Sequence, residues 1–310
     1  MERVIDPLIA DLQGEHAEAV RNGRAWKGRW IQVAGVVAFF KVVVICAWIE
    51  MTTADRWTPD DRKSLMRAAV ISVPTAVVIT ALLVSRSAEN YPKVLLHPSP
   101  TRFLFLAPYP FVAGVVLGTT LGVVLGLGGR ALSRRLVATA IGVALICSAI
   151  VFIDVGWVAP AANIAYRMTI GVSDPAPSFP EPGEQSLGGL RRHIRQFDRD
   201  PALAAFGFPA AMSFDFHRRI AMSFSPLVFT VFALTLAGNV RRRWVLGIAA
   251  CATFVGYVWL VIVATPWRLQ PWDTWSPYAA AWLPNAAIAT LATVFGMLDA
   301  ARRAARRHPA

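Results

Sequence analysis

The chain has 310 residues, of which 55% are apolar and 16% are charged. Soluble globular domains carry about 25% charged residues, so the composition argues against a soluble or a disordered protein. The net charge of +12 comes from short basic clusters between long apolar runs, which is typical of the cytoplasmic loops of membrane proteins rather than of a nucleic-acid-binding surface. We therefore expect an all-α, polytopic membrane helix bundle with no nucleic-acid partner.

The segment 1–30 is predicted to form a cytoplasmic amphipathic helix followed by a basic-aromatic stretch. Asp6 and Pro7 suit the start of a helix, and Asn22-Gly23 suits its end. The basic and aromatic side chains from Arg24 to Trp30 are fit for a headgroup layer.

The next segment, 31–66, contains an apolar run at 31–51 and then a linker. The run is long enough to cross a membrane, but Lys41 lies at its centre. A lysine at mid-bilayer costs about 2.5–3.5 kcal/mol on insertion scales. We expect an interfacial helix here; a seventh span is the alternative.

Six further runs have the roughly 20 mostly apolar residues that a spanning helix needs. They are 67–86, 103–127, 136–159, 220–240, 244–264 and 277–298. They divide into a first three-span half at 67–159 and a second half with a basic tail at 219–310. The outward loop 160–218 lies between the halves, and its residues 186–199 are predicted to form a short basic amphipathic helix.

The basic residues also predict the orientation. The tail after the last run and the turns at 129–135 and 241–243 are rich in arginine, whereas the connection 265–276 has only Arg268. Because cytoplasmic loops collect Lys and Arg, we expect the C-terminus in the cytoplasm and the loop 160–218 on the outer side.

The second of the six runs carries glycines at every fourth position, namely Gly114, Gly118, Gly122 and Gly126. This spacing lines them up on one face of a helix, where another backbone can approach closely. Packing against a neighbouring span within the chain is one interpretation. A dimerisation face, or a face that slides during transport, is the other.

Three polar residues stand inside or at the ends of apolar runs. Asp154 is a candidate functional carboxylate because ionisable groups are costly in the membrane, although interfacial water or a nearby arginine could also account for it. Asn163 and Asn285 lie close to prolines, and each can satisfy a backbone group that proline frees.

Basic side chains gather on the predicted outer side. Arginine forks match phosphate, so these residues are candidates for contact with anionic lipid headgroups; an ordinary interfacial basic cluster is the alternative. They are Arg167, Arg191, Arg192, His217, Arg218 and Arg219.

The sequence lacks the motifs that are typical of catalytic, nucleotide-binding and metal-binding sites. The histidines and cysteines lack metal-ligand spacing, and no phosphate-binding loop, carboxylate pair or nucleophile elbow occurs. We predict no catalytic residue, no metal and no cofactor, and we expect that the protein is not an enzyme. The hypothesis of an intramembrane enzyme would be supported only by Asp154 and scattered histidines.

Five short motifs, in order along the chain, resemble the LptF/LptG permease family, the membrane subunits of the lipopolysaccharide exporter. The resemblance extends over about 67–298. The motifs are Leu106-Ala107-Pro108-Tyr109-Pro110 with the glycine-rich helix after it, Trp157 to Asn163 with Tyr166-Arg167, Leu187 to Ile194, Phe216 to Ala221, and Ala281-Trp282-Leu283-Pro284-Asn285.

The resemblance implies six spans with both termini in the cytoplasm, in agreement with the charge pattern. Two family features have no counterpart. The periplasmic β-jelly-roll does not fit into the loop 160–218, and the cytoplasmic coupling helix between the second and third spans is replaced by the short turn 128–135.

The leading hypothesis is a permease-like subunit in a bacterial inner membrane that engages a lipid or lipid-linked glycan for export. The resemblance implies a second permease subunit, as a homo- or heterodimer, and a separate ABC-type ATPase. The alternative is a non-transporting scaffold or accessory subunit that keeps the permease fold and docks through residues 6–22.

Overall fold

The computed structural model describes residues 58–89, 107–128, 133–169, 184–199, 209–239, 242–263 and 276–307. All of them belong to the second of two units into which the chain divides, Trp57–Ala310. The predicted N-terminal helix and the run 31–51 lie outside the described residues.

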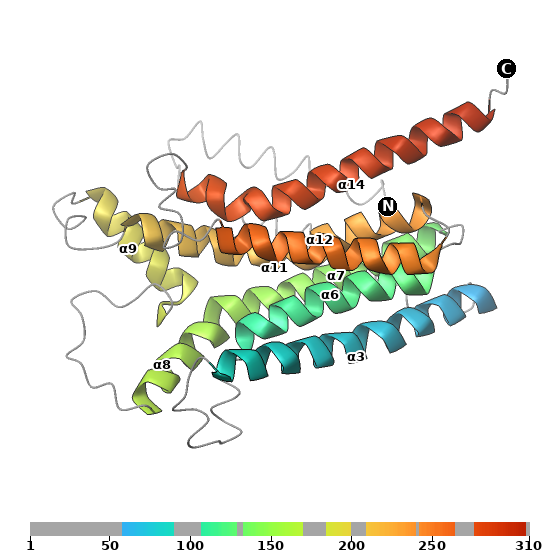
Figure 1. The fold of residues 1–310 in the computed structure, drawn as a ribbon. Helices are drawn as coiled ribbons and strands as arrows, with labels where there is room; N and C mark the ends of the chain where they lie inside the picture. Colours follow the sequence, from blue (N-terminus) through green and yellow to red (C-terminus); the bar gives the residue numbers. More distant parts are fainter. Residues whose placement is uncertain are drawn as a thin grey trace, which may run out of the picture. The chain divides into compact units, whose positions relative to one another are not determined.

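The described part of the chain is helical and contains no strand. Its helices are α3 (Pro59–Glu89), α6 (Pro108–Leu127), α7 (Arg134–Ile153), the π-helix η2 (Asp154–Val158), α8 (Ala159–Thr169), α9 (Leu187–Arg199), α11 (Pro209–Asn239), α12 (Arg243–Val263) and α14 (Pro277–Arg307) (Figure 1).

Six helical segments in the described ranges are long and apolar enough to cross a membrane. They are Pro59–Arg86, Pro108–Leu127, Arg134–Ile164, Pro209–Asn239, Trp244–Ile262 and Pro277–Arg302. The predicted all-α membrane bundle with six spans is therefore confirmed.

Two of the spanning helices, α3 and α11, begin eight or more residues before their apolar runs. α3 begins at Pro59, because Thr58 caps it: the backbone N–H of Asp61 donates to the Thr58 hydroxyl at 3.1 Å. α11 begins at Pro209, although its apolar run begins only at 220. The predicted boundary between the outward loop and the second half therefore falls inside α11.

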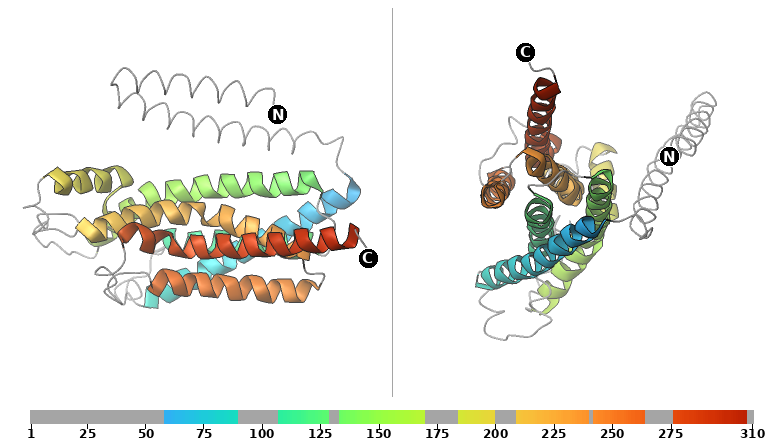
Figure 2. Two further views of the ribbon diagram at one scale, coloured as in Figure 1. Left: turned by 90° about the horizontal axis from the view of Figure 1, so that it is seen from above. Right: turned by 90° about the vertical axis from the view of Figure 1, so that its right-hand side faces the viewer.

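Successive spans run in opposite directions, and α11 lies at their centre (Figures 1 and 2). It packs against α6, α7, α9 and α14, while α12 packs against α6 and α14. Its buried Phe229 and Phe232 join Val116 and Val124 of α6 and Leu246 of α12 in the main apolar core. The core thus ties both halves of the sequence together.

The glycine face of α6 packs against α3. A Cβ on Gly118 would lie 2.6 Å from the Ser72 carbonyl oxygen, and a Cβ on Gly126 would lie 2.7 Å from the Cα of Ala68. Ala68 and Ser72 belong to a row of small residues on α3 that continues, at the same four-residue spacing, with Ala76 and Thr80. Both helices therefore contribute small side chains, and their backbones meet closely along four turns.

The π-helix interrupts the third span just before a proline. The N–H of Ala159 bonds to the carbonyl of Asp154, five residues earlier, and Pro160 follows without an N–H to donate. A π-turn is one way in which a helix adjusts to such a gap. Gly156 of this turn lies under Leu187 of α9, whose Cδ1 would be 3.1 Å from a Cβ there.

A buried polar network joins α11, α12 and α14. The Ser225 hydroxyl lies 2.6 Å from the Tyr257 hydroxyl and 3.1 Å from Asn285 Oδ1. Asn285 Nδ2 donates to the backbone carbonyl of Ala221 at 2.5 Å, in the turn before Pro226. Asn285 therefore satisfies a backbone carbonyl of the neighbouring helix, rather than a local one on α14.

Replacing Asn285 by alanine is expected to destabilise the protein by about 1–2 kcal/mol, because hydrogen bonds between membrane helices contribute about 0.6 kcal/mol on average and about 1.7 at most. Thermal unfolding of the full chain in mild detergent measures this. Thr290→Ala is the matched control, since Thr290 is exposed on the same helix and its hydroxyl donates to the Ala286 carbonyl of that helix. Equal loss in both variants would contradict a role in joining the helices.

Candidate functional site: an ionic cluster where α9 meets α11

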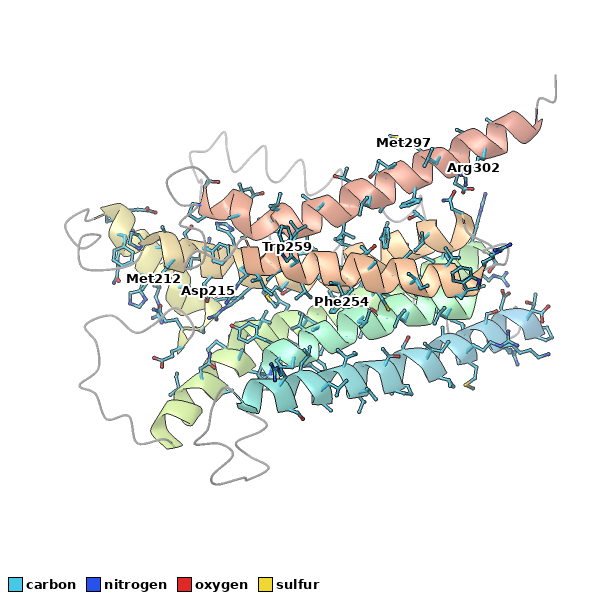
Figure 3. The ribbon with its side chains drawn as sticks, viewed as in Figure 1. Met212, Asp215, Phe254, Trp259, Met297 and Arg302 are labelled. Carbon is cyan, nitrogen blue, oxygen red and sulfur yellow. The ribbon has the colours of Figure 1, made fainter. Side chains whose placement is uncertain are left out.

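The short helix α9 rests on the first turns of α11 through an apolar contact. Leu190 and Phe197 of α9 form a small buried cluster with Met212 of α11, and Ile194 and Phe216 pack against it. Three of these residues lie on the apolar side predicted for the helix at 186–199, and the observed helix, Leu187–Arg199, confirms that prediction. Met212 and Asp215 both lie at this end of the bundle (Figure 3).

One buried carboxylate holds two arginines on α11. Asp215 Oδ1 lies 2.5 Å from Arg218 Nη2, and Asp215 Oδ2 lies 2.6 Å from Arg219 Nη2. The spacings of three and four residues bring all three side chains to one face of the helix. Because one negative charge meets two positive charges, the cluster keeps an excess of positive charge.

The two arginines differ in exposure. The Arg219 side chain is completely buried, whereas the Arg218 side chain is 21% exposed. Arg219 Nη1 also donates to the backbone carbonyl of Gln185 at 2.6 Å, just before α9 begins. Arg219 therefore holds the start of α9 onto α11, and Arg218 is the one of the pair that can reach a ligand.

Aromatic rings flank the guanidinium of Arg218. It lies 5.5 Å from the ring centroid of Tyr109 on α6 and 5.8 Å from that of Phe214 on α11, within range of a cation–π interaction. Its Nε has no hydrogen-bond partner among the described residues. This nitrogen is buried, so the exposed part of the guanidinium, and not Nε, is what an anion could reach.

The space on the inner side of Arg218 is small. A cavity there, bounded also by Met222, Tyr257 and Pro284, has a volume of about 10 Å³, which is room for about one water molecule. This cavity is too small for a lipid headgroup, so only the exposed side of Arg218 is open to a larger ligand.

Gln185 and His193 extend the cluster onto α9. His193 Nδ1 lies 2.6 Å from Gln185 Oε1, while the Gln185 carbonyl accepts from Arg219. The Ser186 hydroxyl accepts from the N–H of Gly189 at 3.3 Å and so caps the helix. The turn before α9 is thus tied both to α9 and to α11.

The remaining predicted headgroup residues are spread over three helices. Arg191 and Arg192 are exposed on α9. His217 is half-buried, with its ring edge-to-face against Tyr278 at 5.1 Å. Arg167 belongs to α8, and its side chain lies outside the described residues. The structure therefore brings together Arg218, Arg219 and α9, and leaves His217 in an aromatic contact.

The predicted intramembrane polar residues do not gather at one place. Asp154 lies in η2, and its buried Oδ2 has no hydrogen-bond partner in the described residues. Asn163 is half-buried on α8, and Asn285 belongs to the network of α11, α12 and α14. Within the described ranges, no group of His, Cys, Asp and Glu could hold a metal ion.

Sequence reasoning missed Asp215 and Gln185. The signal for Asp215 was present, because arginines three and four residues after an aspartate pair with it if the segment is helical. The apolar run begins only at 220, so the segment was assigned to a loop. The contact of the Gln185 backbone carbonyl has no sequence signal.

The fold and the site define a polytopic α-helical membrane protein with a positively charged cluster at one end of its bundle. Residues 176–298 match the family described as lipopolysaccharide export system permease LptF/LptG. This match includes α9, α11, α12 and the part of α14 up to residue 298. It supports membership in the LptF/LptG permease family and confirms the predicted resemblance over these residues, whereas the resemblance predicted for 67–175 stays a prediction. With the six apolar helices, it supports a multi-pass inner-membrane protein. A comparison with curated proteins finds no match.

Proposed function

We propose that this protein is a permease subunit that engages an anionic lipid or lipid-linked glycan during export from the inner membrane. The observation that carries the proposal is the family match over the segment that contains the ionic cluster, 176–298. Permeases of this family belong to lipopolysaccharide export, and lipopolysaccharide is an anionic lipid-linked glycan.

The cluster supports the headgroup part of the proposal. The Arg218 side chain is 21% exposed, and its guanidinium lies near two aromatic rings. Arg191 and Arg192 are exposed on the adjacent α9. A phosphate or carboxylate at this end would meet guanidinium forks, which bind such groups in a bidentate manner.

The orientation in the membrane is part of the proposal. The described helix ends next to the arginine-rich turns, namely the starts of α7 and α12 and the end of α14, lie at the opposite end of the spans from α9 (Figure 1). By the positive-inside rule, that end and the C-terminus face the cytoplasm, and the ionic cluster faces outward.

Replacing Arg218 by glutamine is expected to lower the retention of acidic lipid by about five-fold, since one basic residue near a charged membrane surface contributes about 1 kcal/mol. Native mass spectrometry of the full chain, purified in mild detergent and supplied with an acidic lipid, measures retention. Arg242→Gln, exposed at the opposite end, is the control. Unchanged retention in the Arg218 variant, or an equal loss in both, would remove the headgroup role.

The partners proposed are a second permease subunit, as a homo- or heterodimer, and a separate ABC-type ATPase. Large apolar side chains are exposed on α3 and α12, among them Val70, Val77, Ile248 and Trp259. Such surfaces face lipid or a second membrane protein.

One observation favours the second candidate function, a non-transporting scaffold. α6 ends at Leu127 and α7 begins at Arg134, so the connection is too short for a separate coupling helix. In this case residues 6–22 are the docking element.

Deleting residues 1–25 should then abolish partner binding and leave thermal unfolding of the membrane part unchanged. Partner binding that survives the deletion would contradict the scaffold hypothesis.

A further inference from the structure

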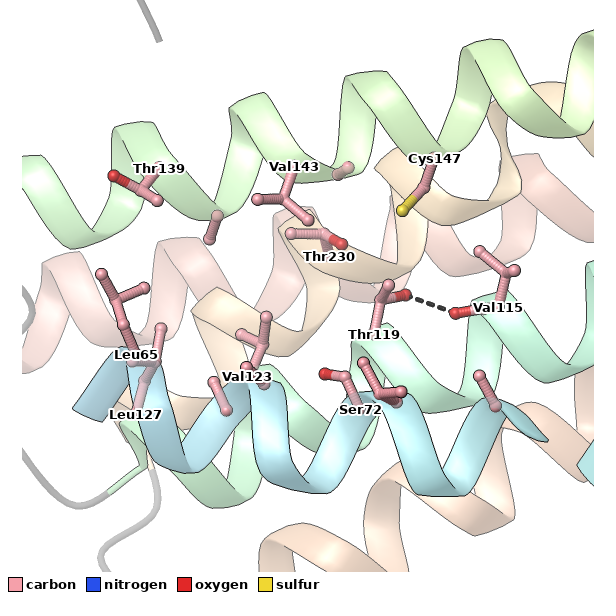
Figure 4. Close-up of a pocket in the computed structure, with 16 residues that line it drawn as sticks. Leu65, Ser72, Val115, Thr119, Val123, Leu127, Thr139, Val143, Cys147 and Thr230 are labelled. Atoms are coloured by element: carbon pink, nitrogen blue, oxygen red, sulfur yellow. Dashed lines mark hydrogen bonds between the residues drawn. The ribbon is translucent and has the colours of Figure 1, made fainter. Parts of the chain in front are cut away.

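A groove lies in the side of the bundle between α3 and α7, with α6 as its floor (Figure 4). Its volume is about 320 Å³, and its walls are almost entirely apolar. The few polar side chains include Thr119, whose hydroxyl donates to the Val115 carbonyl at 2.8 Å. The groove therefore suits a hydrocarbon and offers little to a polar ligand.

The packing of the helices explains the groove. α3 is held against α6 by the glycine face, while α7 packs mainly against α11. Ala69 and Val73 of α3 and Val143 of α7 are therefore left exposed on its walls. Thr230 of α11 also lines it.

The length of the groove matches one leaflet. On α3 it extends from Leu65 to Ala76, and on α7 from Thr139 to Cys147. At 1.5 Å per residue, these segments are about 12–17 Å long, which is about half of the 30 Å hydrocarbon core of a bilayer. The groove thus belongs to the half of the membrane nearer the beginnings of α3 and α7.

Basic residues surround the end of the groove at that membrane surface. Arg62 lies about one helical turn before Leu65 on α3, and Arg135 lies about one turn before Thr139 on α7. Lys63 and Arg134 also lie near the starts of these helices, and Arg67 follows two residues after Leu65 on α3.

Two acidic residues, Asp60 and Asp61, share this end of the groove. The Ser133 hydroxyl lies 3.4 Å from Asp61 Oδ1, and this contact joins the starts of the two helices. Four basic residues, Arg62, Lys63, Arg134 and Arg135, therefore stand against two acidic ones near this end of the groove, and the charge favours an anion.

We infer that the groove binds one acyl chain of an anionic glycerophospholipid, whose phosphate lies among the basic residues at the start of α3 and α7. The inference does not rest on the proposed function, because the ionic cluster at α9 lies at the other end of the spans. The groove would therefore hold a structural lipid that belongs to one leaflet of the membrane.

Phosphatidylglycerol with a photoactivatable diazirine in its acyl chain tests this in nanodiscs that contain the full chain. We expect cross-links within 65–76 and 139–147. Ala69→Phe, which places a ring in the groove, should remove them, whereas Ala81→Phe, also exposed on α3 but outside the groove, should leave them. Arg62→Gln should lower the labelling about five-fold, and Arg242→Gln should not.

Two results would overturn the inference about the tail. One is labelling that is unaffected by Ala69→Phe. The other is a groove filled by the chain's own apolar run 31–51, detected as a cross-link between Cys46 and the groove residue Cys147 with a short bismaleimide. Equal labelling by phosphatidylcholine with the same chains would overturn the anionic headgroup.

Discussion

Replacing Asp215 by asparagine is expected to destabilise the protein by about 3–5 kcal/mol. The Arg219 side chain is completely buried. Removing the charge of its carboxylate partner therefore leaves a buried positive charge without a negative charge to balance it. The contact between α9 and α11 should loosen as well, because Arg219 also holds the Gln185 carbonyl. Thermal unfolding in mild detergent measures the loss, and proteolysis within the segment before α9 should become faster.

The matched control is Asp198→Asn, because Asp198 is exposed on α9 and its loss should cost little. A second control replaces the whole ionic cluster by combining Asp215→Leu with Arg218→Leu and Arg219→Leu, because Asp215 pairs with both arginines. Replacing a complete buried ionic group by apolar residues is often neutral or stabilising, so the triple variant should regain much of the stability. If Asp215→Asn unfolds at the same temperature as Asp198→Asn, the buried ion pair does not stabilise the fold.

Replacing Gly122 by valine is expected to cost about 3 kcal/mol, at the upper end for overpacking a tight contact. A Cβ there would lie 2.7 Å from the Ala68 carbonyl oxygen and 3.0 Å from the Ser72 Cβ. The backbone of α3 must therefore move away from α6. Since α3 packs chiefly on α6, its attachment to the bundle should weaken.

Gly256→Val on α12 is the matched control, because a Cβ at Gly256 meets nothing within 4 Å. Thermal unfolding of the two variants in the same detergent compares them. Similar stability of both would contradict a close helix contact at the glycine face.

The six spans were predictable because each is a long apolar run, and membrane helices must satisfy their backbone internally. The helix starts were less predictable. Pro209 to Arg219 contains an aspartate, a histidine and two arginines, so hydropathy excludes it, and only the pairing of Asp215 with both arginines makes its burial tolerable.

The glycine face was predictable, but its partner was not identified from the sequence. Four-residue spacing in Gly114–Gly126 indicates a close approach by some helix. The matching row of small residues on α3 begins with Ala68 and Ser72 and is interspersed with valines, so it does not stand out in the sequence. That this row contacts α6 follows only from the packing of the helices. The groove between α3 and α7 is likewise a result of helix packing, and no residue pattern in the sequence predicts it.

The candidate site was predicted in part. The basic residues at 217–219 were recognised, but their roles differ: Arg219 is a buried link to α9, Arg218 is partly exposed, and His217 lies edge-to-face against Tyr278. Equal exposure of neighbouring arginines cannot be assumed from sequence. Adjacent residues on a helix point in different directions, and only the packing decides which of them is buried.

Affinity purification of the full chain from native membranes in mild detergent, with mass spectrometry of proteins and lipids, tests the central claim most directly. A permease subunit that engages lipid for export predicts an ABC-type ATPase and a retained anionic lipid-linked glycan in the eluate, with the lipid reduced by Arg218→Gln. An eluate that holds another membrane protein, but neither an ATPase nor such a lipid, would contradict the claim and favour the scaffold.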